Sequence, residues 1–126
     1  MGQIDNVITI PASTEKRFFR YWLEFLKPFH KLTDKETEIM AEFLRQRHEL
    51  SKAIKDQELL DKVVMSEDTK RTIRKECEIS QTYFQVIMTK LKKSKMIDNG
   101  RINPKFIPRL KENADNFQLL ISFNLK

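Results

Sequence analysis

The stretch from residue 66 to residue 108 constrains the fold more than any other part of the chain. Ser66 and Ser80 each stand where a side-chain oxygen can cap the first turn of a helix. Asn99-Gly100, placed between apolar residues, is the strongest short signal for a β-hairpin. The stretch therefore predicts a helix, a tight turn, a second helix and a hairpin. The second helix has apolar residues at the spacing of one buried face, namely Phe84, Ile87, Met88 and Leu91.

The other side of this second helix carries small polar and apolar side chains. Thr82, Gln85 and Thr89 can exchange hydrogen bonds with base edges, and Val86 can contact a thymine methyl group. Phosphates attract cations that position a protein without specifying sequence. The cations expected at phosphates are Lys90, Lys92, Lys93, Lys95, Arg101 and Lys105. The alternative is that the helix is only a scaffold element with a solvated polar face.

Basic residues are concentrated in one part of the chain. Between residues 90 and 111 there are eight lysines and arginines and one acid, Asp98, so this window accounts for the formal net charge of +6. A localised basic field on a helix end and a hairpin is typical of a surface that binds a phosphate backbone. A lysine-rich surface that only keeps the protein soluble is the alternative.

Short motifs in the same region resemble known DNA-binding proteins. Residues 77–80 (C-E-I-S), followed by Phe84 and Ile87, resemble the L-G-I-S-x-x-x-V-x-x-I core of many bacterial regulators. Residues 32–36 (L-T-D-K-E) resemble the L-T-x-R-E opening of response-regulator DNA-binding domains, although a longer segment follows here. Residues 32–108 are most similar to small winged-helix proteins encoded by tailed bacteriophages. The resemblance implies a winged helix-turn-helix that binds double-stranded DNA, with Glu78 where the family usually has glycine.

The 126 residues predict one domain of mainly α structure with a small β component, an α+β fold. Residues 1–31 are expected to form a strand and an aromatic helix, residues 32–108 the helix-turn-helix core and wing, and residues 109–126 a final strand. The strand predictions rest on the β-branched run 7–10 and on the alternation of apolar residues over 117–125.

The aromatic helix is expected to begin after Ser13 or Thr14 and to stop before Pro28. It is apolar on more than one face, which indicates that it is enclosed or meets a second surface. We expect a subunit or partner contact, because aromatic residues are enriched at interfaces. Core packing on both sides is the alternative. The residues assigned to this contact are Phe18, Tyr21, Trp22 and Phe25.

Two more helices connect these parts. Thr33 and Glu36 predict a capping box at the start of the longest helix, which spans 32–54. Asp56 can cap a short helix that reaches Met65. The buried stripe of the long helix is expected to hold Ile39, Met40, Phe43, Leu44, Leu50 and Ile54.

Motifs for catalysis, cofactors or metals are lacking in the sequence, so no enzymatic activity is expected. His30 and His48 stand far apart without a ligand cluster, and Cys77 is expected to be a small buried apolar residue. There is neither an apolar run of about 18 residues nor a signal peptide, which predicts a soluble, cytoplasmic protein without a membrane partner.

Two functions from different classes remain open. The first is binding of double-stranded DNA by a small transcriptional regulator, located in the host cytoplasm if it is phage-encoded. The second is a bacteriophage virion or assembly component that uses the fold for contacts between proteins. Either way, we expect a homo-oligomer or a phage protein partner.

Overall fold

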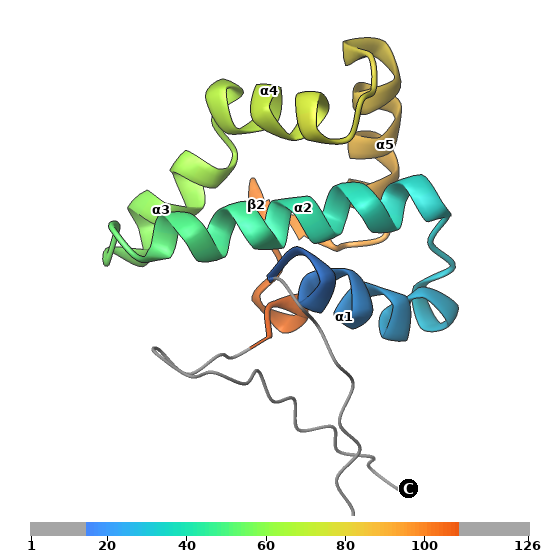
Figure 1. Cartoon of the computed structure of the whole chain (residues 1–126), viewed down its shortest axis with the longest axis horizontal. Coiled ribbons are helices and arrows are strands. Elements are labelled where there is room, and N and C mark those ends of the chain that lie inside the picture. Colours follow the sequence, from blue (N-terminus) through green and yellow to red (C-terminus); the bar gives the residue numbers. More distant parts are fainter. Residues whose placement is uncertain (1–14, 109–126) are drawn as a thin grey trace, which may run out of the picture.

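The computed structural model describes residues 15–108, which form five helices and a small hairpin (Figure 1). This arrangement confirms the mainly α class with a small β component. The two strands predicted at 7–10 and 117–125 lie outside the described residues, as does the cap predicted at Ser13 or Thr14. The elements are α1 (Glu15–His30), α2 (Asp34–Ser51), α3 (Gln57–Val64), α4 (Glu67–Glu76), α5 (Gln81–Lys93), β1 (Ile97–Asp98), β2 (Arg101–Ile102) and η1 (Pro104–Phe106).

Helix α2 is the centre of the fold. It contacts α1, α3 and α4, and Figure 1 shows it between α1 on one side and α4 on the other. The rings of Phe43 in α2 and Phe84 in α5 stack with centroids 6.2 Å apart, which brings α5 onto the same core. As predicted, the core includes Ile39, Met40, Phe43 and Leu44, whereas Leu50 and Ile54 are only partly buried.

The four helix caps predicted within the described residues are confirmed, although the longest helix begins at Asp34 and not at Leu32. The side chains of Thr33, Asp56, Ser66 and Ser80 each accept a backbone N–H from the first turn of the helix that follows. The capping box at α2 takes a different form from the one expected, because the Thr33 hydroxyl donates to Glu36 Oε2 at 2.7 Å. The glutamate therefore fixes the capping side chain itself.

The predicted ends of α1 and α2 are wrong by a few residues. Helix α1 continues through Pro28 to His30 and ends where Lys31 adopts a left-handed φ of 52°. The Leu32 N–H then bonds to the Lys27 carbonyl at 3.3 Å, which is the closing bond of a Schellman motif. A proline in the last turn removes a single helical hydrogen bond, so it does not stop the helix. Helix α2 ends at Ser51, before Ile54.

The turn between α4 and α5 uses the same left-handed geometry. Glu78 has a φ of 53°, its N–H bonds to the Lys75 carbonyl at 3.3 Å, and the Ile79 N–H bonds to the Arg74 carbonyl at 3.1 Å. These are the two bonds of a Schellman motif. Glutamate at this position adopts the conformation that glycine adopts without strain, so the turn stays tight.

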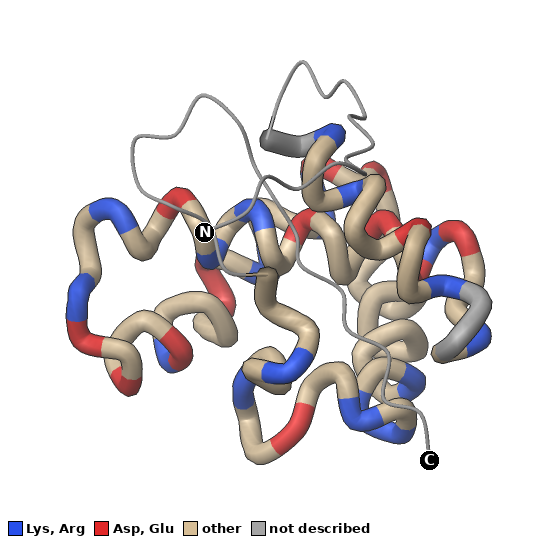
Figure 2. Tube along the Cα trace, turned by 90° about the horizontal axis from the view of Figure 1, so that it is seen from below, with Lys and Arg blue, Asp and Glu red and all other residues tan. Residues whose placement is uncertain are grey.

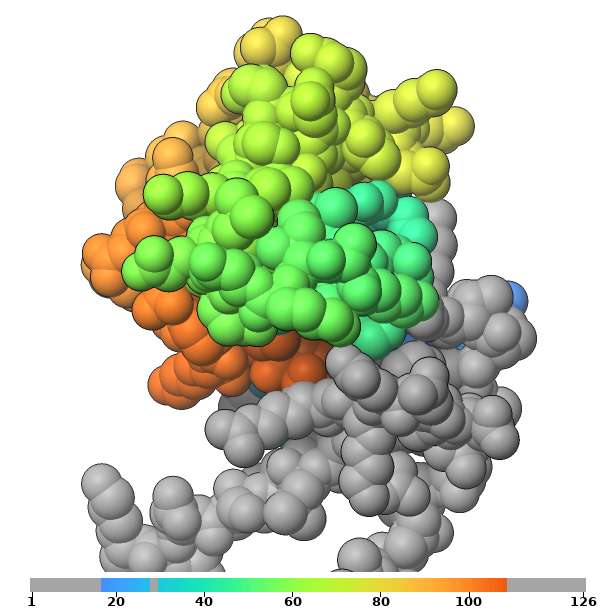
Figure 3. Space-filling view, turned by 90° about the vertical axis from the view of Figure 1, so that its left-hand side faces the viewer, coloured from blue at the N-terminus to red at the C-terminus, as the bar shows by residue number. Residues whose placement is uncertain are grey.

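The hairpin matches the prediction from Asn99-Gly100. Both residues have positive φ angles, 55° and 72°, as a type I′ turn requires. Ile97 pairs with Ile102 in antiparallel register. Strand β2 contacts α3, and Figure 3 shows the orange hairpin region against the green surface of α3. The hairpin is therefore held between α3 and the end of α5.

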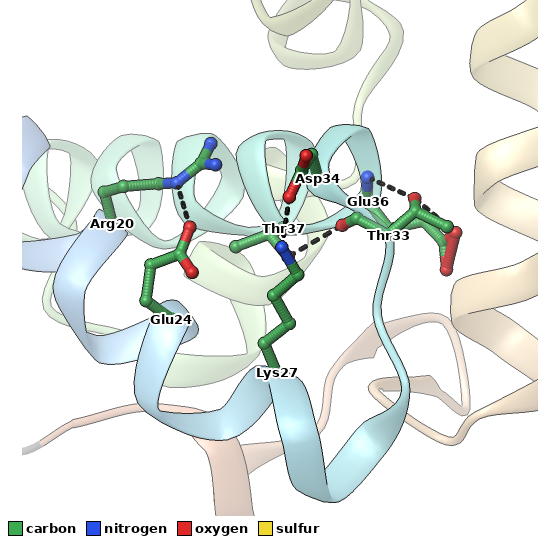
Figure 4. A network of polar contacts seen from close by, with 7 residues as sticks. All are labelled: Arg20, Glu24, Lys27, Thr33, Asp34, Glu36 and Thr37. Carbon is green, nitrogen blue, oxygen red and sulfur yellow. Dashed lines mark hydrogen bonds and ion pairs between the residues drawn. The ribbon is translucent and has the colours of Figure 1, made fainter.

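Polar contacts fix α1 to the rest of the molecule (Figure 4). Lys27 forms an ion pair with Asp34 at the start of α2, whereas Arg20 pairs with Glu24 at 2.9 Å within α1 itself. At the far end of the chain, the Trp22 indole N–H donates to the Phe106 carbonyl at 2.8 Å. Helix α1 is thus tied to both α2 and η1.

Candidate nucleic-acid interface

Helix α5 separates its buried and exposed residues as the sequence predicts. Phe84, Ile87, Met88 and Leu91 are buried, which fixes the rotation of the helix about its axis. The opposite side exposes Thr82, Gln85, Val86 and Thr89, named here the outer stripe. With Gln81, these four residues line a shallow, open depression on the surface. The structure therefore brings together all four predicted base-contacting residues.

The outer stripe offers mixed but uncharged chemistry. Gln85 presents an amide that both donates and accepts hydrogen bonds. The Thr89 hydroxyl donates to the Gln85 carbonyl at 3.0 Å, which leaves its oxygen free to accept. Val86 is 48% exposed and adds methyl groups to this surface. Donors, acceptors and methyl groups are the features that base edges present in the major groove.

Lysines surround the outer stripe. By the helical period, Lys90 and Lys92 lie on opposite flanks of it, and Lys93 continues its line one turn beyond Thr89. Helix α5 contains no acidic residue. Within residues 15–108, no ion pair forms at Lys90, Lys92, Lys93 or Lys95. The uncharged stripe is thus bordered by cations without a charged partner in the described chain.

The hairpin adds cations next to the end of α5. The Asn103 side-chain amide donates to the Lys95 carbonyl at 2.9 Å, and the Asn103 N–H donates to the Met96 carbonyl at 2.9 Å. Figure 2 shows several Lys and Arg positions gathered at the end of α5. The hairpin itself carries Arg101 and one acid, Asp98, and Lys105 follows in η1. Arg101 and Lys105 are both exposed, so the structure keeps all six predicted phosphate-binding residues at the surface.

Arg101 has a contact that the sequence does not reveal. Its Nη1 lies 3.7 Å from Asp61 Oδ2 in α3, and Arg47 Nε of α2 lies 3.7 Å from Asp61 Oδ1. Asp61 therefore orients Arg101 from a helix that precedes it by forty residues in sequence. No local pattern marks such a pair. Gln81 and Tyr83 are also exposed on α5, although they are not among the predicted contact residues. The helical period of the sequence is the signal that predicts their exposure.

The residues predicted for a partner contact on α1 fall into two groups. Phe18 is buried in the core, with its ring centroid 5.3 Å from that of Phe19, so it is not available to a partner. Trp22 is partly buried and bonded to Phe106. Tyr21 and Phe25 remain 39% and 40% exposed. Burial of Phe18 follows from the packing of α1 on α2.

The cysteine and the two histidines are packed against other residues of the fold. Burial, reinforced by Glu38 and Glu42, raises the pKa of the Cys77 thiol to about 12, so the sulfur stays protonated at neutral pH. His30 packs edge-on against Phe106 at 4.8 Å, and His48 lies 5.8 Å from Phe19. Over the described part of the chain, no three His, Cys, Asp or Glu residues are grouped to hold a metal ion.

No helix within residues 15–108 combines the length and apolar character needed to span a membrane.

Comparison of the chain with protein-family models, with curated proteins and with solved structures found no significant match. Evidence for a function therefore comes from the surface of α5 and the hairpin.

Proposed function

We propose that the protein is a small, non-enzymatic regulator that binds double-stranded DNA through a winged helix-turn-helix. Helix α4 and helix α5 form the helix-turn-helix, α5 enters the major groove, and the hairpin acts as the wing. One observation carries this proposal: an exposed uncharged stripe on α5 is bordered by lysines that lack charged partners among the described residues.

The dimensions of α5 fit a groove of duplex DNA. An α-helix with its side chains is about 10–12 Å across. The major groove of B-DNA is about 12 Å wide. When α5 lies along the groove, Lys90 and Lys92 on the two flanks of the outer stripe face the two backbones that border it. Bases then face the outer stripe, and phosphates face the lysines.

The start of α5 also favours a phosphate backbone. The first turns of α2, α3 and α4 each carry acidic residues, which neutralise the positive end of the helix dipole. The first turn of α5 carries none. This end of α5 thus adds to the positive field of the lysines.

Fluorescence anisotropy with labelled duplex DNA tests the proposal. We expect binding at low salt that weakens steeply as salt rises, because phosphate contacts release counterions. Lys93→Ala and Arg101→Ala should each lower the slope of log affinity against log salt by about one. Lys52→Ala is the matched control, because it removes the same charge from the lysine at the C-cap of α2, which pairs with Glu49 at 3.2 Å. Absence of binding at low salt, or equal effects of Lys52→Ala and Lys93→Ala, contradicts the proposal.

A virion or assembly component is the second candidate function. It is favoured by the exposed aromatic side chains of Tyr21 and Phe25, which lie one turn apart on α1. Under this alternative the protein forms homo-oligomers or binds a phage protein through α1 and is found in the particle. The regulator is instead expected in the host cytoplasm.

Analytical ultracentrifugation with and without duplex DNA distinguishes the two candidates. Assembly through apolar contacts persists at high salt and is lost in a Tyr21→Ser/Phe25→Ser variant. A salt-resistant oligomer that ignores DNA supports the assembly component. A particle that grows only when duplex DNA is added, and only at low salt, supports the regulator.

A further inference from the structure

We infer that the outer stripe of α5 selects A·T base pairs from the major groove and uses the thymine methyl group as one determinant. This inference rests on the proposed function, because it concerns the sequence that α5 contacts when it lies in a groove.

The first argument is the absence of a cation from the outer stripe. Guanine is recognised most often by arginine or lysine, which donate to its O6 and N7 atoms. Thr82, Gln85, Val86 and Thr89 include neither. Lys90 and Lys92 lie on the flanks, and Lys93 lies one turn beyond Thr89, at the end of the stripe. The centre of the stripe thus lacks the groups that favour G·C pairs.

The second argument is the chemistry of two neighbouring side chains of the stripe, Gln85 and Val86. Gln85 can donate to N7 and accept from the N6 amino group of one adenine. Val86 is the next residue on the same exposed face, and its 48% exposed side chain has no polar atom. Its methyl groups gain buried apolar contact only from a partner such as the C5-methyl of thymine. The chemistry of Gln85 thus matches adenine, and that of its neighbour Val86 matches thymine.

The length of the stripe sets the size of the site. About 10 Å of helix faces roughly three base-pair steps of 3.4 Å. A preference for A·T pairs can also arise when an arginine enters a narrow minor groove. Arg101 on the hairpin is the candidate for that route, but it lies 3.7 Å from the carboxylate of Asp61. The observations on α5 favour the major groove.

A competition experiment with the full-length protein and four duplexes of equal length distinguishes recognition in the major groove from recognition in the minor groove. Their central three pairs are A·T, G·C, inosine·C or A·U. Inosine·C resembles G·C in the major groove and A·T in the minor groove, because inosine lacks the N2 amino group. A·U differs from A·T only by the missing methyl group. The expected result is about tenfold tighter binding of A·T than of G·C and inosine·C, with A·U between them.

Two variants assign the effects to side chains. Gln85→Ala should reduce the ratio of A·T to G·C affinity, and Val86→Ala should reduce the ratio of A·T to A·U affinity, because alanine offers less apolar contact to the thymine methyl group. Leu59→Ala is the control for Val86→Ala, because Leu59 is 50% exposed on α3, away from α5. It should leave the A·T to A·U ratio unchanged. Circular dichroism of each variant confirms that the helices remain formed.

The outcomes are distinct. Inosine·C binding as tightly as A·T, or G·C binding as tightly as A·T, overturns the inference while the salt-dependent binding to DNA stands. Equal affinity for A·T and A·U in the parent protein overturns the role of the methyl group. Absence of binding to all four duplexes at low salt contradicts the proposed function itself.

Discussion

Charged residues behave differently on the two sides of this molecule. On α1, α2 and α3 many of them form ion pairs, and some of these join one helix to another. On α5 and in the turn that follows, the lysines have no such partners among the described residues. The ion pairs on α1, α2, α3 and the cap of α2 include Arg20–Glu24, Lys27–Asp34, Lys35–Glu38, Arg45–Glu42, Arg47–Asp61 and Lys52–Glu49.

This difference separates charges that have partners within the fold from charges that are available to an external partner. Like charges without partners repel one another, and binding of an anion would relieve that repulsion. Helix α5 is attached to the core through its apolar face, with Phe84 against Phe43 and under Arg74. Stability and binding should therefore respond to different substitutions.

The largest effect is expected at the apolar attachment of α5. Phe84→Ala empties a fully buried aromatic site and should lower the free energy of unfolding by about 3–5 kcal/mol. Chemical denaturation followed by circular dichroism measures this loss. Tyr83→Ala, at the exposed neighbour, should cost less than about 1 kcal/mol. Similar losses for both variants would mean that α5 is not held by its apolar face.

The next effect is expected at the most buried ion pair. Glu42 is 3% exposed in its side chain and accepts hydrogen bonds from Arg45 and Gln46. Glu42→Ala removes the carboxylate that accepts the hydrogen bonds of Arg45 and Gln46, and it should cost about 1–3 kcal/mol. Glu24→Ala breaks the exposed pair with Arg20 and should cost less than about 1 kcal/mol. Thermal unfolding of the two variants measures these costs. Equal losses of stability would contradict the expected difference between the buried pair and the exposed pair.

A smaller effect of opposite sign is expected at the turn that joins α4 to α5. Glu78→Gly relieves the left-handed backbone and should stabilise the protein by roughly 1 kcal/mol. Glu78→Ala removes the charge but keeps the Cβ atom, so it should give no such gain. Urea denaturation of the two variants measures the difference. Stabilisation by alanine would indicate that charge, and not backbone geometry, limits this turn.

The smallest effect on stability is expected at the unpaired lysines. Lys92→Ala and Lys93→Ala should change the free energy of unfolding by less than about 0.5 kcal/mol, as is usual for exposed positions. The same substitutions should weaken DNA binding. A loss above about 1 kcal/mol in denaturation would assign these lysines to the fold and undo the comparison.

The sequence predicts features that depend on residues three or four apart. The caps at Ser66 and Ser80, the buried face around Phe84 and the Asn99-Gly100 turn all arise from local spacing, and the structure has each of them. The exposure of the outer stripe follows from the same period. These local rules therefore predict both the pair of helices α4 and α5 with the turn between them and the exposed surface of α5.

Features that depend on tertiary packing were not predictable. The ion pair of Arg101 with Asp61 requires α3 to lie beside β2, and the burial of Phe18 requires α1 to lie on α2. The end of α1 after Pro28 depends on the left-handed conformation of Lys31, for which lysine carries no signal. DNA binding and the winged-helix assignment stay predictions.

The bond between Trp22 and Phe106 joins residues 84 positions apart, near the two limits of the described fold. Most other contacts of α1 are with α2, its neighbour in sequence. Closing so long a loop is entropically unfavourable until the intervening helices are in place. Trp22 is the sole tryptophan of the chain, so its fluorescence reports this closure without a label. Refolding followed by tryptophan emission should thus lag behind the recovery of helical circular dichroism.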